Sequence, residues 1–170
     1  GDAAVAMVTV DCGVAPPAPP SPPPQQPPSL PPPPAMPGTT TFTFASSTTP
    51  GWSTGDGSYP FTHWSGGTPS DGTGPSAGVG GSGAYKYAET SDPRVEGDLF
   101  SLAYDGSACA AEGLSIASVD FHYHMYGATM GELRLVDAAG TTVWSLRGDQ
   151  GDAWLAASAD VLSSSFAFEY

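Results

Sequence analysis

The feature that most constrains this chain is a proline tract that separates a short N-terminal segment from a much longer body. Pro16 to Pro37 holds fourteen prolines in 22 residues, and proline fixes φ and lacks a backbone donor, so neither helix nor sheet can form there. Polyproline II is expected, with a reach of about 68 Å at about 3.1 Å per residue. The chain is therefore expected to have three parts: a strand segment at 1–13, a linker at 14–38 and a folded domain at 39–170.

The N-terminal segment has the pattern of a β-strand that is apolar on both faces. Strict alternation places Val5, Met7 and Thr9 on one face, and Ala4, Ala6, Val8 and Val10 on the other. Such a strand is apolar enough on both sides to be buried. The tract that follows contains no glycine at which the chain would normally bend back.

Beyond Gly38 the pattern is all-β, with short runs of Thr, Phe, Tyr, Val and Trp between turn residues. The clearest strand covers Leu114 to Tyr126. Val119, Phe121, Tyr123 and Met125 fall on one face of it, and Asp120, His122, His124 and Tyr126 on the other. No stretch has convincing helical periodicity. The predicted fold is an antiparallel β-sandwich or jelly roll.

Charge and composition exclude several classes of function. A net charge of -13 repels a phosphate backbone, so nucleic acid is a poor partner. No run of about 18 apolar residues is present, so no membrane span is expected. The sequence has no Asn, which leaves only O-linked glycans on Ser, Thr or modified Pro. Its two cysteines favour one disulfide, within a unit or between neighbouring units, over a metal or catalytic thiol.

Four segments of the body, taken in order and spacing, resemble the MAM domain, an extracellular β-sandwich adhesion module. They are residues 63–75 (HWSGGTPSDGTGP), residues 83–91 (GAYKYAETS), residues 121–127 with 130–133 (FHYHMYG and MGEL), and Trp144 with residues 147–151 and Trp154. Residues 1–12 (GDAAVAMVTVDC) resemble the last strand of the same family. The resemblance therefore implies that 39–170 is a sandwich lacking its last strand.

In the family the first and last strands lie close together, so closure within one chain would require the stiff tract to double back. The predicted donor strand, which comprises Ala3, Ala4, Val5, Ala6, Met7, Val8, Thr9 and Val10, is therefore expected to fill a sheet edge of a neighbouring unit. That neighbour is either a separate chain or the next repeat of one polypeptide. The alternative is a loose terminal strand or closure of its own domain. The resemblance also implies a disulfide between Cys12 and Cys109, here between neighbouring units.

The proline tract has a resemblance of its own. Its Ser-Pro-Pro-Pro runs are similar to those of hydroxyproline-rich cell-wall glycoproteins, which implies hydroxylation and arabinose or galactose chains. The prolines that match are Pro22, Pro23, Pro24, Pro31, Pro32, Pro33 and Pro34. The alternatives are a bare rigid spacer or a ligand for an aromatic groove.

Catalytic and metal-binding patterns are sparse. His122 and His124 share one strand face, but no third ligand stands at metal-site spacing, and the resemblance makes His124 structural. Glu89 and Asp92, with Glu96 and Asp98, offer oxygens that suit Ca²⁺, although a solvated charged edge is favoured because acidic residues usual in the family's first and last strands are absent. His63 has no adjacent nucleophile in a strained turn, so no hydrolase triad is supported.

These observations predict a non-enzymatic extracellular protein, secreted or held at a cell surface or cell wall, with no cofactor. Its units are expected to join head to tail by β-strand complementation into a homopolymeric fibre, with an O-glycosylated proline rod. The alternative is a carbohydrate- or protein-binding adhesion module on a rigid spacer, in which Trp52, Tyr59 and the loop at 66–83 make the contacts.

Overall fold

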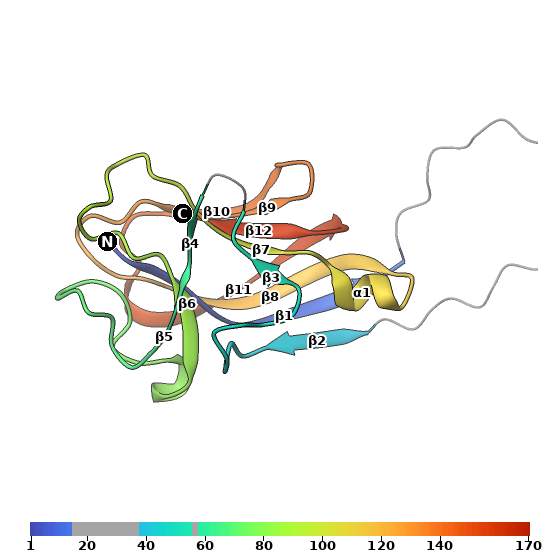
Figure 1. Cartoon of the computed structure of the whole chain (residues 1–170), viewed down its shortest axis with the longest axis horizontal. Coiled ribbons are helices and arrows are strands. Elements are labelled where there is room, and N and C mark those ends of the chain that lie inside the picture. The colour runs from blue at the N-terminus through green and yellow to red at the C-terminus, as the bar shows by residue number, and fades with distance from the viewer. Residues whose placement is uncertain (15–37, 56–57) are drawn as a thin grey trace, which may run out of the picture.

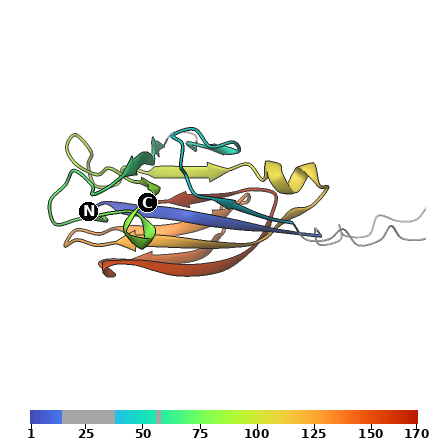
Figure 2. The same ribbon diagram turned by 90° about the horizontal axis from the view of Figure 1, so that it is seen from below.

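The computed structural model describes residues 1–14, 38–55 and 58–170, which form two β-sheets packed face to face (Figures 1 and 2). The all-β sandwich expected from the sequence is confirmed. Residues 15–37 lie outside the described part, so polyproline II and the glycosylation sites at Pro22 to Pro24 and Pro31 to Pro34 stay predictions.

The first sheet, called sheet A, has the strand order β11-β8-β1-β6-β5, and β2 also pairs with β1. Its strands are β1 (Ala3–Gly13), β2 (Thr39–Phe42), β5 (Thr62–Ser65), β6 (Ala84–Tyr87), β8 (Ser115–Met125) and β11 (Gly151–Ser163). Every pairing in it is antiparallel. β8 runs along one side of β1, and β6 and β2 share the other side, so β1 is a central strand.

The second sheet, called sheet B, has the order β10-β9-β12-β7-β3, and β4 pairs with β7 in parallel. Its strands are β3 (Trp52–Ser53), β4 (Tyr59–Pro60), β7 (Phe100–Tyr104), β9 (Glu132–Asp137), β10 (Thr142–Arg147) and β12 (Phe166–Glu169). The 3₁₀ turn η1 (Val79–Gly81) and the short helix α1 (Ser107–Ala111) complete the described elements.

The core between the sheets combines aliphatic side chains with a group of aromatic side chains on β8, β10 and β12. Phe121 is 1 % exposed, and its ring centroid lies 4.8 Å from that of Phe168 and 5.0 Å from that of Trp144. Edge-to-face pairs of this kind add to the stabilisation from burial. The two faces predicted for this strand are correct, because Val119, Phe121, Tyr123 and Met125 are all buried in the core.

The faces predicted for the N-terminal strand are wrong, because β1 contains a bulge. Its register with β8 shifts between Ala6 and Thr9, and Met7 adopts φ 47°. The extra residue resets the alternation, so Val5 and Val8 both join the core although they are an odd number of positions apart. Met7, predicted to share a face with Val5, is instead 39 % exposed.

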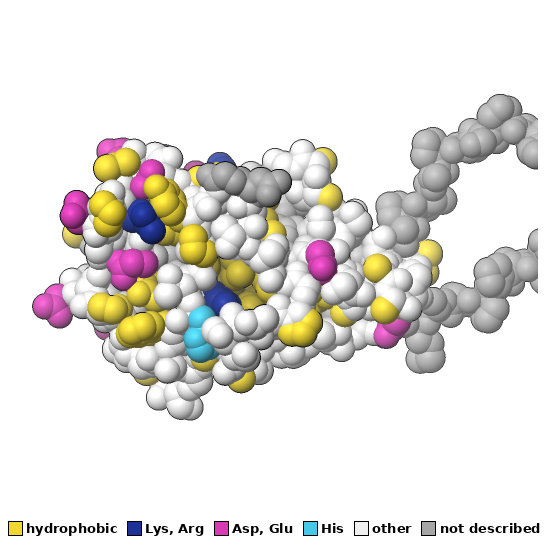
Figure 3. All heavy atoms as spheres, in the orientation of Figure 1, with side chains coloured by type: hydrophobic (Ala, Val, Ile, Leu, Met, Phe, Trp, Pro, Cys, Tyr) yellow, Lys and Arg dark blue, Asp and Glu magenta, His cyan; other side chains and the backbone are white. Residues whose placement is uncertain are grey.

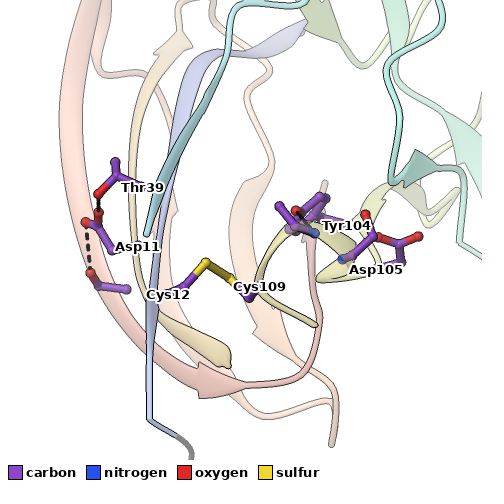
Figure 4. Close-up of a disulfide and its surroundings, with 9 residues drawn as sticks. Asp11, Cys12, Thr39, Tyr104, Asp105 and Cys109 are labelled. Atoms are coloured by element: carbon purple, nitrogen blue, oxygen red, sulfur yellow. Dashed lines mark hydrogen bonds between the residues drawn. A yellow bond between two sulfur atoms is a disulfide. The ribbon is translucent and has the colours of Figure 1, made fainter. Parts of the chain in front are cut away.

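The helix α1 has no counterpart in the sequence analysis, because five residues are too few to show a helical period. It begins after Gly106, which has φ 72°. A Cβ at this position would collide with the carbonyl oxygen of Ser164, so glycine is required for both its backbone angle and its close approach. The turn presents Cys109 toward sheet A (Figure 4).

We expect Phe121→Ala to lower the free energy of unfolding by about 3–5 kcal/mol, because it opens a cavity where the two sheets meet. Urea denaturation followed by tryptophan fluorescence measures the change. Asp120→Asn, at the exposed neighbouring position, should leave stability within about 0.5 kcal/mol of the wild type. A loss below about 1 kcal/mol for Phe121→Ala would show that this contact is not central to the core.

Candidate strand-exchange interface

The interface that closes the sandwich consists of β1 and the strands on both sides of it. β1 pairs with β8 from Ala3↔Met125 to Gly13↔Ser115. On the other side its first half pairs with β6 and its second half with β2. Six of its apolar side chains are fully buried, namely Ala3, Ala4, Val5, Ala6, Val8 and Val10, each 0 % exposed. Ala4 and Ala6 fit beneath Tyr85 and Tyr87 on the outer face of sheet A, where larger side chains would clash.

The first residues of the chain are held at the end of the sandwich where both termini lie (Figure 1). Asp2 is 1 % exposed, and its Oδ1 accepts hydrogen bonds from the backbone N–H and the hydroxyl of Thr90, at 3.1 and 3.0 Å. The Thr73 hydroxyl accepts one from the Asp2 N–H at 2.8 Å. The Tyr170 hydroxyl donates to the Gly1 carbonyl at 2.8 Å, so the start of β1 lies beside the residue that follows β12.

The far end of β1 is fixed by a disulfide between Cys12 and Cys109, 97 positions apart in sequence (Figure 4). Both residues are buried in the core, at 2 % and 1 % exposure. Asp11 points to the opposite side, where its Oδ1 accepts a hydrogen bond from the Thr39 hydroxyl at 2.6 Å. The Cys12 N–H donates to the Gly38 carbonyl at 2.8 Å, so the two ends of the proline tract meet side by side in this closed form.

In this structure of one chain, β1 closes its own domain, which is the alternative arrangement of the sequence analysis. The structure also corrects the expectation that the N-terminal strand fills the edge of a sheet. β1 is hydrogen-bonded to neighbouring strands along both of its edges, and its apolar side chains are buried on both faces of the sheet. This is the environment of a central strand. Exchange between copies would therefore fill a gap in the middle of sheet A.

The sequence-based metal candidates do not converge. Within the described ranges, no group of three or more His, Cys, Asp and Glu side chains is placed to hold a metal ion. Glu89 is engaged by its own loop, since its Oε2 accepts from the Tyr87 hydroxyl at 2.9 Å and its Oε1 from the Ser91 N–H at 3.0 Å. These contacts are those of a hydrogen-bonded turn.

His124 lies on the outer face of sheet A in contact with β1 and β11. It is 2 % exposed, pairs in register with Ala4, and places its Nε2 3.2 Å from the Asp152 carboxylate. Its ring centroid is 5.5 Å from that of Trp154. Burial lowers the pKa of His124, and the charge and hydrogen bond of Asp152 offset part of that shift.

The aromatic residues proposed to contact a ligand are placed differently from expectation. Trp52 packs against Phe42, Phe44, Tyr104 and Phe166, with ring centroids 5.1–5.6 Å away. Tyr59 is covered by the Arg94 guanidinium, 3.8 Å from its ring centroid. Trp64, which sequence reasoning did not single out, is 37 % exposed and donates from Nε1 to the Gly67 carbonyl at 2.7 Å. Neither Trp52 nor Tyr59 is a free stacking platform.

We expect the free energy of unfolding to fall as the pH drops below His124's ordinary pKa of 6.5, because the unfolded chain then binds a proton that the buried imidazole resists. His124→Gln should remove this contribution. Asp152→Asn should extend the loss to lower pH, because it removes the carboxylate that favours the protonated ring. Denaturant titrations from pH 7.5 to 4.5 measure the slope of the free energy of unfolding against pH.

A residue that does not titrate provides the control for that series. Ser158→Ala, at an exposed position of β11, should keep the pH slope of the wild type. If His124→Gln had the same slope as the wild type, the pH dependence could not be assigned to His124.

Comparison with known proteins agrees with this architecture. The family model for the MAM domain, meprin/A5/mu, matches residues 41–170, about three quarters of the chain. MAM domain-containing glycosylphosphatidylinositol anchor protein 1 from Gallus gallus and from Homo sapiens is 39 % identical over 93 residues. Protein 2 of that name from Mus musculus is 37 % identical over 97 residues. Each alignment covers 48 % of this chain, which spans about a tenth of the relatives' length.

MAM domains are extracellular, non-catalytic adhesion modules, so a domain of this family lies outside the cell. The relatives are glycosylphosphatidylinositol-anchored by name. Across the described ranges, no helix has the length and hydrophobicity needed to cross a membrane. The match over residues 41–170, together with two packed sheets of the expected kind, shows that the chain belongs to the MAM domain family.

Proposed function

We propose that this chain is an extracellular structural protein whose units join head to tail by exchanging β1. The observation that carries the proposal is the position of β1, a central and largely buried strand that the polypeptide joins to its domain only through the proline tract. Every contact that β1 makes within one chain can be made in the same register with a second copy. Exchange therefore changes only whether the tract turns back to its own domain or extends to another copy.

The tract favours the exchanged form because of its composition. Closure within one chain requires residues 14 and 38 to lie side by side, as the Cys12 to Gly38 hydrogen bond shows. A tract with fourteen prolines and no glycine resists the necessary reversal, whereas an extended tract can reach a neighbour about 68 Å away. In the exchanged form Cys12 of one copy would bond Cys109 of the next and lock the strand covalently.

The resulting contact has a direction. Each copy offers one β1 and one gap between β8 and the strands β6 and β2, so donor and acceptor surfaces differ. A heterologous contact of this kind builds an open filament unless its geometry closes a ring. If the next repeat of one polypeptide supplied β1, the strand would fill the same gap. The contact between Gly1 and Tyr170 is compatible with this arrangement.

Isotope mixing tests exchange directly. Reduced, unfolded chains with ¹⁵N and with natural isotopes are mixed, refolded and oxidised, and the peptides that contain the Cys12–Cys109 disulfide are weighed by mass spectrometry. We expect abundant peptides with one labelled and one unlabelled half, and filaments by electron microscopy. A matched variant with 16–37 replaced by a Gly-Ser linker of equal length should return mainly same-isotope peptides, because it turns back freely. Same-isotope peptides alone from the natural tract would overturn the proposal.

We further propose that the tract is a hydroxylated and O-glycosylated rod. Its Ser-Pro-Pro-Pro runs at 21–24 and Ser29-Leu30-Pro31-Pro32-Pro33-Pro34 support this, as does the lack of any Asn for N-linked glycans. Sugars would keep the rod solvated and stiff.

Peptide mass spectrometry of protein from its native source should therefore find hydroxyl and pentose or hexose additions on Pro22 to Pro24 and Pro31 to Pro34. The peptide that carries Pro60 provides an internal comparison outside the tract and should have its unmodified mass. Unmodified peptides throughout 16–37 would show that the spacer is bare.

The second candidate function is a carbohydrate- or protein-binding module on a spacer. A specific observation favours it, namely a hollow of about 380 Å³ beside Trp52. Binding there and exchange of β1 are compatible, because no residue of β1 lines the hollow.

A further inference from the structure

A hollow of about 380 Å³ opens where the β5–β6 edge of sheet A meets the loop before β3. Its apolar wall comes from Trp52, Phe61 and Leu102, and hydroxyl groups of Ser and Thr residues between 47 and 54 surround its mouth. Figure 3 shows this face, with a histidine and a basic side chain beside hydrophobic side chains. The volume falls in the range of small-molecule sites, about 300–1,000 Å³.

The hollow contains a buried cation. Lys86 is 8 % exposed, and its Nζ donates to the Ser47 carbonyl at 2.8 Å and lies 6.0 Å from the Phe44 ring centroid. An ammonium group has three N–H donors, so this single hydrogen bond leaves two for a further partner. The ion pairs among the described residues are those of His124 and Arg134, and neither involves Lys86. Burial accordingly lowers the pKa of Lys86.

Trp52 and His63, which also line the hollow, carry further donor and acceptor groups. The indole Nε1 of Trp52 is buried and has no hydrogen-bond partner among the described residues, although such groups normally find one. His63 Nε2 lies 3.0 Å from the Phe44 carbonyl, which can only accept, so this nitrogen carries the proton. In the neutral ring Nδ1 is then an acceptor. The wall thus combines hydroxyls, one ring acceptor, an apolar surface and a cation that has no ion pair among the described residues.

We propose that this hollow binds a carboxylate-bearing sugar, a uronic acid. The carboxylate would pair with the Lys86 ammonium, the sugar hydroxyls would meet the Ser and Thr hydroxyls and His63, and the C–H face of the ring would lie on the apolar wall. A neutral sugar leaves the ammonium unpaired, and an apolar ligand leaves the hydroxyls unpaired. The inference rests on the second candidate function and is independent of β1 exchange.

The net charge of the chain limits where an anionic ligand can bind. At a net charge of -13 the overall field repels anions, so an anion binds only where local contacts overcome that repulsion. Lys86 is one of four Lys and Arg residues in the chain. Arg134 is already paired with Glu169 at 2.8 Å, and Arg94 stacks on Tyr59. Of these three cations, Lys86 is the one that is buried beside this hollow.

The test uses the variant with a Gly-Ser linker in place of 16–37, which is expected to close on itself, so that strand exchange does not affect it. Titration with D-galacturonate at pH 7, followed by ¹H–¹⁵N spectra, should shift resonances of residues 47–54 and 86, and D-galactose and acetate should bind at least tenfold more weakly. Lys86→Met should weaken galacturonate binding at least tenfold. Arg134→Met, which removes one positive charge elsewhere, should stay within twofold of the wild type.

A blocking variant keeps the test decisive if Lys86→Met unfolds. Thr48→Trp places a large ring at the exposed mouth of the hollow and leaves Lys86 unchanged, and it should also abolish binding. Equal binding of galactose and galacturonate, or of acetate and galacturonate, would overturn the assignment, as would unchanged binding in Thr48→Trp. Isotope mixing measures strand exchange in a separate experiment. Failure of the exchange proposal can therefore be distinguished from failure of the uronic acid proposal.

Discussion

The burial of β1 between β8 on one side and β6 and β2 on the other is the constraint on which the whole structure depends. Its apolar side chains complete the core, and its backbone satisfies donors and acceptors on two neighbouring edges. Without it, β8 and β6 would each expose an unpaired edge in the middle of a sheet, which is costly in a buried layer. The domain therefore needs this strand, whichever copy supplies it.

Much of the fold could be predicted from local patterns. The alternation around Phe121 identified the core face of β8 because, from Val119 to Met125, the extra residues at its two register shifts lie on the partner strands β1 and β11, so β8 itself alternates there without interruption. The same reasoning gave the wrong faces for β1, because one extra residue at Met7 reverses the alternation and its φ of 47° is not encoded by a glycine. The helix α1 was missed because five residues carry no measurable period.

The candidate sites were predictable to different degrees. The likeness of residues 1–12 to a closing strand indicated which segment completes the sandwich, but only the pairing of β1 with β6 and β2 shows that it is central. The hollow around Lys86 could not be predicted, because its residues come from four separate parts of the chain and one lysine in an alternating strand has the pattern of an exposed residue. Trp52, which was predicted to contact a ligand, lines this hollow and packs on Phe166, and its contact with a ligand stays a prediction.

The position of the disulfide has a mechanical consequence. A pull on the proline tract would act at residue 14, and Cys12 stands two positions from that point, bonded to Cys109 beside β8. Load would thus enter the body of the sandwich through a covalent bond before it reached the backbone ladder of β1. Residue 38, the other attachment point of the tract, lies beside Cys12, so a pull between these two points would act on the end of the antiparallel β1–β2 ladder. The disulfide would keep that ladder from opening from this end one hydrogen bond after another.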